Sequence, residues 1–240
     1  MADDVTYGSY LRLEQLLTLQ EPHVEAHDER TFIIVHQLYE LCFSLMLFEL
    51  ASARDAMLAG EEEPALRFLR RVGVIDRVLA SQIDLIETIV PQDFLEFRPS
   101  LQSGSGFQSV QFREVEFLCG LKEPRYLEQI DLNDPDRARL ERRLDEPSVW
   151  DGFVALLGRY GSPSIVEVYR GREAHPWPFL IAEALLDHDE GFTVWRARHV
   201  LMVERELGTK TGTGGAGAPY LMRTLEKRFF PELWAARSEL

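Results

Sequence analysis

Cysteine is scarce in this sequence, and positive charge falls well short of negative charge. The two cysteines, Cys42 and Cys119, lie in separate hydrophobic segments, so we expect no disulfide framework and a reducing cytoplasm fits. Lysine and arginine number 26 against 40 acidic residues, which gives a formal net charge of -14. This balance argues against nucleic acid and anionic membranes as partners, because no cationic surplus exists to displace counterions from phosphates.

Long hydrophobic runs and alternating β-branched patterns are also missing. No apolar run approaches the roughly 18 residues that a membrane span needs, and residues 1–6 lack the basic and hydrophobic parts of a signal peptide. Hydrophobic residues still make up 45% of the 240 positions, enough for a sizeable core. Without internal repeats or a long linker, we expect one all-α, bundle-like domain over 1–240, with 1–20 as an N-terminal arm.

Apolar residues at three- and four-residue steps predict a series of amphipathic helices. One is expected over 29–58 with Asp28 as its N-cap, and the next over 64–89, ended by Pro91. Two long helices joined by a few residues predict an antiparallel pair. Further helices are expected over 6–20, 107–118, 133–146 (solvated), 149–159, 179–207 and 219–235, with a loop over 92–110.

The segment 195–217 combines an apolar helix face with a glycine-rich loop. Trp195, His199 and Leu207 share the apolar stripe, whereas Arg196 lies mostly off it. The spacing therefore predicts that His199 points inward. A single histidine on such a face is more often a core residue with satisfied nitrogens than a ligand.

A second inward histidine lies in the helix over 29–58. His36 follows Phe32 by one turn, so the two are neighbours on one face. Two histidines that face one pocket can flank a metal or a haem, and neither has a Cys, Asp or Glu at zinc-like spacing on its own face. A plain core with one hydrogen-bonded histidine is the alternative interpretation.

The stretch 92–110 holds an arginine among aromatics and a glycine-rich run. Arg98 lies between Phe97 and Pro99, a setting that suits a structural ion pair or a clamp for a substrate carboxylate. The Ser-Gly-Ser-Gly run at 103–106 either lets backbone amides approach a ligand or is simply a flexible loop.

Four motifs in a fixed order carry a resemblance to a known family. They are Thr-Tyr-Gly-Ser-Tyr-Leu-Arg-Leu-Glu-Gln-Leu-Leu at 6–17, His-Asp-Glu at 27–29 with Phe-Ile-Ile-Val-His-Gln at 32–37, Ser-Gly-Phe-Gln-Ser-Val-Gln-Phe-Arg at 105–113, and Trp-Arg-Ala-Arg-His with Gly-Thr-Gly-Gly within 195–215. With these motifs the chain resembles the tryptophan 2,3-dioxygenase family, all-helical haem enzymes. The resemblance implies haem b with ferrous iron, O2 as co-substrate, cleavage of the indole C2–C3 bond of L-tryptophan to N-formylkynurenine in the kynurenine pathway, and a cytoplasmic homotetramer.

The resemblance also implies a role for each matching residue. His199 matches the proximal haem ligand, and His36 matches the distal histidine near the indole nitrogen. The other matches are Phe32 and Phe94 beside the indole, Arg98 at the substrate carboxylate, Thr213 at its ammonium and carboxylate, Ser105 in the loop near the distal pocket, Gly106 and Trp195 against the haem, and Tyr7, Tyr10 and Leu11 in an arm that reaches a neighbouring subunit's active site.

Departures from the family pattern leave the reaction open. The segment before the His199 helix is shorter than expected, Ala-Gly-Ala-Pro at 216–219 lacks two expected hydroxyls, and Cys42 stands where a tryptophan is expected. The alternative is a biosynthetic relative that mono-oxygenates a tryptophan derivative, such as a β-methyltryptophan, to a 2-oxindole. A non-enzymatic haem sensor or indole-binding module is disfavoured by Arg98 and Thr213, because a gas sensor needs no amino-acid clamp.

Overall fold

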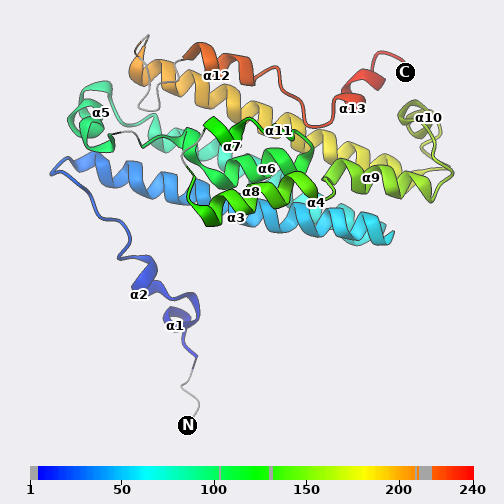
Figure 1. Cartoon of the computed structure of the whole chain (residues 1–240), viewed down its shortest axis with the longest axis horizontal. Helices are drawn as coiled ribbons and strands as arrows, with labels where there is room; N and C mark the ends of the chain where they lie inside the picture. Colours follow the sequence, from blue (N-terminus) through cyan, green and yellow to red (C-terminus); the bar gives the residue numbers. More distant parts are fainter. Residues whose placement is uncertain (1–4, 103, 130–131, 209, 211–217) are drawn as a thin grey trace.

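The computed structural model describes residues 5–102, 104–129, 132–208, 210 and 218–240, and within them every regular element is a helix (Figure 1), which confirms the all-α prediction. Three long helices form the body: α3 (His27–Ala59), α4 (Glu62–Ile86) and α11 (Pro176–Leu207). The shorter elements are α1 (Tyr7–Leu11), α2 (Leu13–Leu16), α5 (Pro91–Phe97), η1 (Arg98–Leu101), η2 (Gly106–Gln108), α6 (Val110–Cys119), α7 (Tyr126–Gln129), α8 (Asp134–Asp145), α9 (Val149–Gly158), α10 (Ile165–Arg170), α12 (Ala218–Thr224) and α13 (Pro231–Ala236).

The tight turn between α3 and α4 follows from local sequence. Gly60 ends α3 with a φ of 78°, which a residue without a side chain adopts most easily, and Glu62 and Glu63 lie in the first turn of α4, where the helix dipole favours acidic groups. The predicted antiparallel pair is thus present. The predicted N-cap is wrong by two residues, because Ala26 caps α3 and Asp28 lies inside its first turn.

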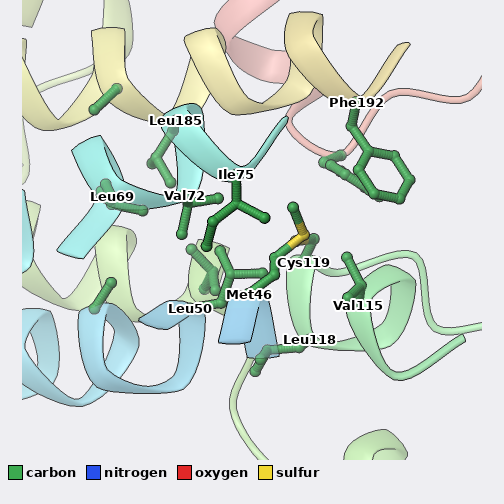
Figure 2. Packing of buried hydrophobic residues seen from close by; sticks show 14 of the residues in the cluster. Met46, Leu50, Leu69, Val72, Ile75, Val115, Leu118, Cys119, Leu185 and Phe192 are labelled. Carbon is green, nitrogen blue, oxygen red and sulfur yellow. The ribbon is translucent and has the colours of Figure 1, made fainter. Parts of the chain in front are cut away.

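The core lies where α3, α4, α6 and α11 meet (Figure 2). A close approach of α4 and α11 depends on Gly191, because a Cβ there would lie 2.9 Å from the Cβ of Asp76. Figure 2 shows the side chains that fill this region: Met46 and Leu50 from α3, Leu69, Val72 and Ile75 from α4, Val115, Leu118 and Cys119 from α6, and Leu185 and Phe192 from α11.

Prolines begin helices at three points, at the first of which we expected a helix to end. α4 ends at Ile86 and Pro91 is the first residue of α5, so the expected loop over 92–110 contains α5, η1 and η2. Pro176 likewise lies in the first turn of α11, and Pro231 opens α13 and so divides the helix expected over 219–235. The first turn tolerates proline because its N–H would have no partner there.

The charged helix α8 is only partly solvated, contrary to expectation. Arg139 and Arg143 on this helix both form ion pairs with Glu114 of α6, which is 1% exposed. One face of α8 therefore neutralises a buried carboxylate of the core.

The N-terminal arm is two short helices instead of the single helix expected over 6–20. Arg12 has a φ of 52° and separates α1 from α2. Figure 1 shows both helices away from the helical body, and their apolar side chains are largely exposed.

Helix α3 is long and apolar enough to cross a membrane by length and composition, which the inspection of apolar runs did not anticipate. It also contains buried charged residues, Glu29, Glu49 and Arg54, and it packs along α4, α6 and α9. A core helix passes the same test of length and composition, so we treat α3 as part of the core.

Candidate functional site

A cavity of about 570 Å³ lies between α3, α5, the segment 104–109, α6, α11 and α12. Its volume falls in the range of small-molecule and cofactor sites, roughly 300–1,000 Å³. In Figure 1 the start of α3, the end of α11, α5 and α12 all lie at one end of the body. Eight residues that the sequence singled out line this cavity: Phe32, His36, Phe94, Arg98, Ser105, Gly106, Trp195 and His199.

His36 is fixed by its own helix. Its Nδ1 lies 2.8 Å from the carbonyl oxygen of Phe32, one turn earlier on α3. Because a carbonyl only accepts hydrogen bonds, Nδ1 carries the proton and Nε2 of the neutral ring keeps its lone pair. Burial lowers the pKa of His36, against smaller opposing effects of the hydrogen bond to the Phe32 carbonyl and of the Glu40 carboxylate. His36 is therefore a neutral acceptor in the cavity wall.

Phenylalanines build the wall beside this histidine. The rings of Phe32 and His36 have centroids 4.0 Å apart, and Phe94 lies 6.0 Å from Phe32. Phe97, which is fully buried, lies 5.4 Å from Phe32 and 5.2 Å from Phe94 and so anchors both. These rings, which are tilted or edge-on to one another, present an apolar aromatic surface next to a hydrogen-bond acceptor.

His199 approaches the cavity from α11. Its ring lies 5.5 Å from that of Trp195, one turn earlier, and among the described residues neither ring nitrogen makes a hydrogen bond. Burial, with a smaller contribution from the nearby His36, lowers the pKa of His199 to about 4. The ring is neutral at neutral pH, and neutral imidazole is the form that binds iron.

Arg98 and the segment after it form another part of the lining. Arg98 begins η1 directly after buried Phe97 and is half-buried at the cavity. Ser105 caps η2 by accepting from the backbone N–H of Phe107 at 3.3 Å. A Cβ built on Gly106 would meet no atom within 4 Å, so this glycine borders open space in the cavity.

Three other residues proposed for the site, all in the N-terminal arm, do not line this cavity. Tyr7, Tyr10 and Leu11 lie in α1, are 77%, 77% and 41% exposed, and do not line it. Their expected role concerns the site of a neighbouring subunit, so it stays a prediction. Thr213 lies outside the described residues.

Tyr39, Arg196 and Arg113 also line the cavity, although the sequence predicted no functional role for them. Tyr39 is 5% exposed on α3, and its ring meets that of Trp195 edge-on, with centroids 6.0 Å apart. Arg196 was expected off the apolar stripe but is 3% exposed, because α11 is surrounded on several sides, and Arg113 of α6 is equally buried. Both arginines lie inside motifs on which the family resemblance rests, and that position was the only indication in the sequence that they belong to the site.

The lining fits a haem in three respects. His199 offers a neutral nitrogen without a hydrogen-bond partner in the described residues, aromatic rings flank the space, and Gly106 leaves room beside it. His199 would then hold the iron, with Trp195 and Gly106 against the macrocycle.

The sequence is similar to known proteins over nearly its full length. The sequence model of the family described as Tryptophan 2,3-dioxygenase matches residues 1–151 and 153–240. The tryptophan 2,3-dioxygenase of a Nocardioides species is 49% identical over 253 aligned residues, which cover 98% of this chain and 95% of the relative. Those of Herpetosiphon aurantiacus and Caulobacter vibrioides are 43% and 39% identical, each with 100% of both chains covered. The chain belongs to the tryptophan 2,3-dioxygenase family.

Proposed function

We propose that this protein is a haem-dependent enzyme that converts L-tryptophan and O2 to N-formylkynurenine. The observation that carries the proposal is the content of the cavity: two neutral histidines lie there with a phenylalanine cluster and Arg98. Neither ring nitrogen of His199 makes a hydrogen bond to a described residue, whereas Nδ1 of His36 is bonded to the Phe32 carbonyl. The names of the relatives support tryptophan as the substrate. Nothing in the cavity or in the comparisons favours mono-oxygenation of a substituted tryptophan.

The cofactor in this proposal is haem b, held through Nε2 or Nδ1 of His199. When bound in its ferrous form, the haem supplies the activation of O2, which no side chain can provide. The low pKa of His199 keeps its ring neutral over the whole physiological range. Its neighbour Trp195 limits rotation of the ring by packing against it.

The residues opposite the iron ligand position the substrate. Phe32 and Phe94 pack on the indole faces, and Nε2 of His36 accepts the indole N–H, since Nδ1 already donates to the Phe32 carbonyl. Arg98 binds the carboxylate with its guanidinium. Holding the amino-acid end and the ring at once fixes the C2–C3 bond over the oxygen-binding face and excludes water from it.

The assembly we propose is a cytoplasmic homotetramer in which α1 contributes to a neighbouring site. Supporting this, Tyr7 and Tyr10 are mostly exposed although aromatic, and α1 lies away from the body of its own chain (Figure 1). Exposed aromatic side chains on a short helix suit contact with another subunit. Thr213, in the segment 211–217, remains our candidate for the substrate's ammonium and carboxylate.

The reaction is tested by mass spectrometry of the products formed under 18O2. Reduced, haem-loaded enzyme is given L-tryptophan and, separately, a β-methylated tryptophan. We expect two labelled oxygen atoms in N-formylkynurenine from tryptophan. One labelled atom in a 2-oxindole, formed preferentially from the methylated substrate, would replace our proposal with mono-oxygenation, and no product from either substrate would reject both.

A further inference from the structure

Helix α3 has two apolar faces that point in different directions. One face packs along α4, α6 and α9. The opposite face carries four large apolar side chains that are mostly open to solvent: Ile34 at 38%, Leu41 at 54%, Leu45 at 46% and Phe48 at 66% exposure. Only 28% of the most apolar 18-residue stretch of α3 is therefore buried. This exposed face, which we call the α3 seam, is left uncovered by the described part of the chain.

The seam has the spacing of a helix that packs against another helix. Together with the half-buried Leu38, its members follow one another at steps of four and three residues from Ile34 to Phe48. This heptad spacing keeps the side chains on one line, where they fit between the side chains of a facing helix. Single apolar residues on a surface need no explanation, whereas a continuous line of them on one long helix marks an interaction surface.

The two ends of the seam carry opposite charges. Arg30 is exposed one turn before Ile34 and makes no hydrogen bond or ion pair with a described residue. Asp55 lies two turns after Phe48, and its side chain is 64% exposed although it contacts the neighbouring Arg54. A helix with a positive end, an apolar middle and a negative end is complementary to a copy of itself that runs in the opposite direction.

A lipid surface fits the seam less well than a second copy does. The formal net charge of -14 disfavours anionic lipids. The helix cannot leave the core to enter a bilayer either, because Glu49 and Arg54 are 1% and 9% exposed on its other faces and would lose their partners. Figure 1 shows α1 and α2 away from the body, so the chain's own arm leaves the seam open.

We propose that the α3 seam binds the α3 seam of a second copy of this chain, antiparallel across a two-fold axis. Leu41 of one copy then meets Leu45 of the other, and the Arg30 end of each helix lies beside the Asp55 end of its partner. Each contact occurs twice, because both copies use the same patch. The antiparallel order also sets the positive end of each helix dipole beside the negative end of the other. The inference names a surface for the assembly proposed above and depends neither on the haem nor on the reaction.

The test uses a pair of substitutions that oppose each other only in this arrangement. The full-length protein is studied by sedimentation velocity and native mass spectrometry. Leu41→Lys alone and Leu45→Glu alone each bury an unpaired charge twice, and each should raise the dissociation constant of the seam contact by roughly a hundredfold. Mixing the two variants, one of them labelled with 15N, places the new lysine opposite the new glutamate and should yield complexes that contain one copy of each.

Leu85→Glu is the matched control. Leu85 of α4 is 48% exposed, close to the 46% of Leu45, but lies outside the seam. This variant should sediment like wild type. The substituted side chains are exposed in the single chain, so each variant should fold, and circular dichroism with urea unfolding checks this. Recovery of association on mixing also separates a disrupted contact from a misfolded chain.

Four results would overturn the inference. Seam variants that keep the mass of the wild-type assembly would show that the seam is not a contact between copies. Variants that dissociate but do not recover on mixing would show that the seam meets a different surface. Binding of the wild type to neutral lipid vesicles, lost in both seam variants, would assign the seam to a membrane. A monomeric wild type would reject both the inference and the proposed homotetramer, whereas the 18O2 experiment tests the reaction independently.

Discussion

His188 and His199 lie about three helical turns apart on α11, and their surroundings differ. Nδ1 of His188 lies 2.9 Å from Asp76, and its Nε2 lies 3.5 Å from the sulfur of Cys119. Burial alone would lower the pKa of His188, but Asp76 and Cys119 outweigh it and raise that pKa to about 10. His199 has no hydrogen-bond partner among the described residues, and its pKa falls to about 4.

The comparison teaches that burial alone does not separate a structural histidine from a ligand. His188 is the satisfied core histidine that we had considered for His199, and its partners bind α4, α6 and α11 together. What distinguishes His199 is an unused lone pair at the wall of a cavity. His36 lies between the two, because one nitrogen is committed to Phe32 and the other is free to act.

Removing His199 should have the largest effect on the enzyme and a small effect on the fold. His199→Ala loses the iron ligand, so we expect stoichiometric haem to be lost and turnover to fall by several orders of magnitude. The apoprotein should unfold within about 1 kcal/mol of wild type, because no hydrogen bond is broken. Haem content, the Soret spectrum and urea unfolding of the apoprotein measure the three quantities.

His188→Ala is the control for this prediction, since the same substitution on the same helix should leave haem ligation intact in the folded fraction. Retention of normally ligated haem by His199→Ala would refute the assignment of His199 as the iron ligand.

Removing His188 should instead destabilise the fold. His188→Ala leaves Asp76, which is 1% exposed, without its partner, and breaking a buried pair in this way costs about 3–5 kcal/mol. Urea unfolding of the apoprotein measures the loss. The double variant His188→Ala with Asp76→Ala should recover part of it, because the unpaired carboxylate is gone. A loss below about 1 kcal/mol would mean that the pair contributes little to holding the three helices together.

Arg98 is a charged cavity residue that, like His199, we expect to bind a ligand and not to hold the fold together. Arg98→Ala should weaken tryptophan binding by about 2–4 kcal/mol, since the substrate's carboxylate loses its charged partner, while haem content stays at the wild-type level. Arg98→Lys should have an intermediate affinity for tryptophan, because lysine keeps the positive charge but lacks the planar guanidinium group that can form two hydrogen bonds to a carboxylate. Titration of the ferrous enzyme with tryptophan, read from the visible spectrum, measures the affinity. An Arg98→Ala variant that titrates like wild type would remove Arg98 from the substrate site.

Periodicity predicted most of the fold. The apolar steps in α3, α4 and α11 identified the three long helices, because their buried faces repeat with the helical period. The helix ends were less predictable, since a proline such as Pro91 or Pro176 fits the first turn of one helix as well as the end of another. Arg12 is a similar case, because nothing in the residue type signals its positive φ.

The site was predictable only as far as its residues belonged to recognisable motifs. His36 and His199 lie 163 positions apart, and only the packing of both α3 and α11 against α4 brings their side chains to one cavity. Arg196 was misjudged because a helix buried on several sides has no single apolar stripe, so a charged residue beside the stripe is also enclosed. Asp76 and Cys119 carried no sequence signal for their contact with His188, which depends on tertiary structure alone.

The smallest expected effects are opposite pH dependences of stability at the two histidines. The pKa of His188 is raised from 6.5 to about 10 in the folded protein, so its stabilisation is complete below pH 6.5 and is lost as the pH rises through 10. The pKa of His199 is lowered from 6.5 to about 4, so the folded state is fully favoured above pH 6.5 and is progressively disfavoured as the pH falls through 4. One pKa unit corresponds to about 1.4 kcal/mol, so these intervals set upper limits of about 5 kcal/mol for His188 and about 3 kcal/mol for His199.

Urea unfolding of the apoprotein between pH 4 and pH 10 measures both effects as differences from wild type. The destabilisation caused by His188→Gln should shrink as the pH rises above 6.5, because the wild type then loses the contribution that the variant already lacks. His199→Gln should gain stability relative to wild type as the pH falls below 6.5, because the variant has no imidazole to protonate. Difference curves with the same slope for both variants would show that the two rings share one electrostatic environment, and the contrast between a structural histidine and a ligand on α11 would then rest on haem binding alone.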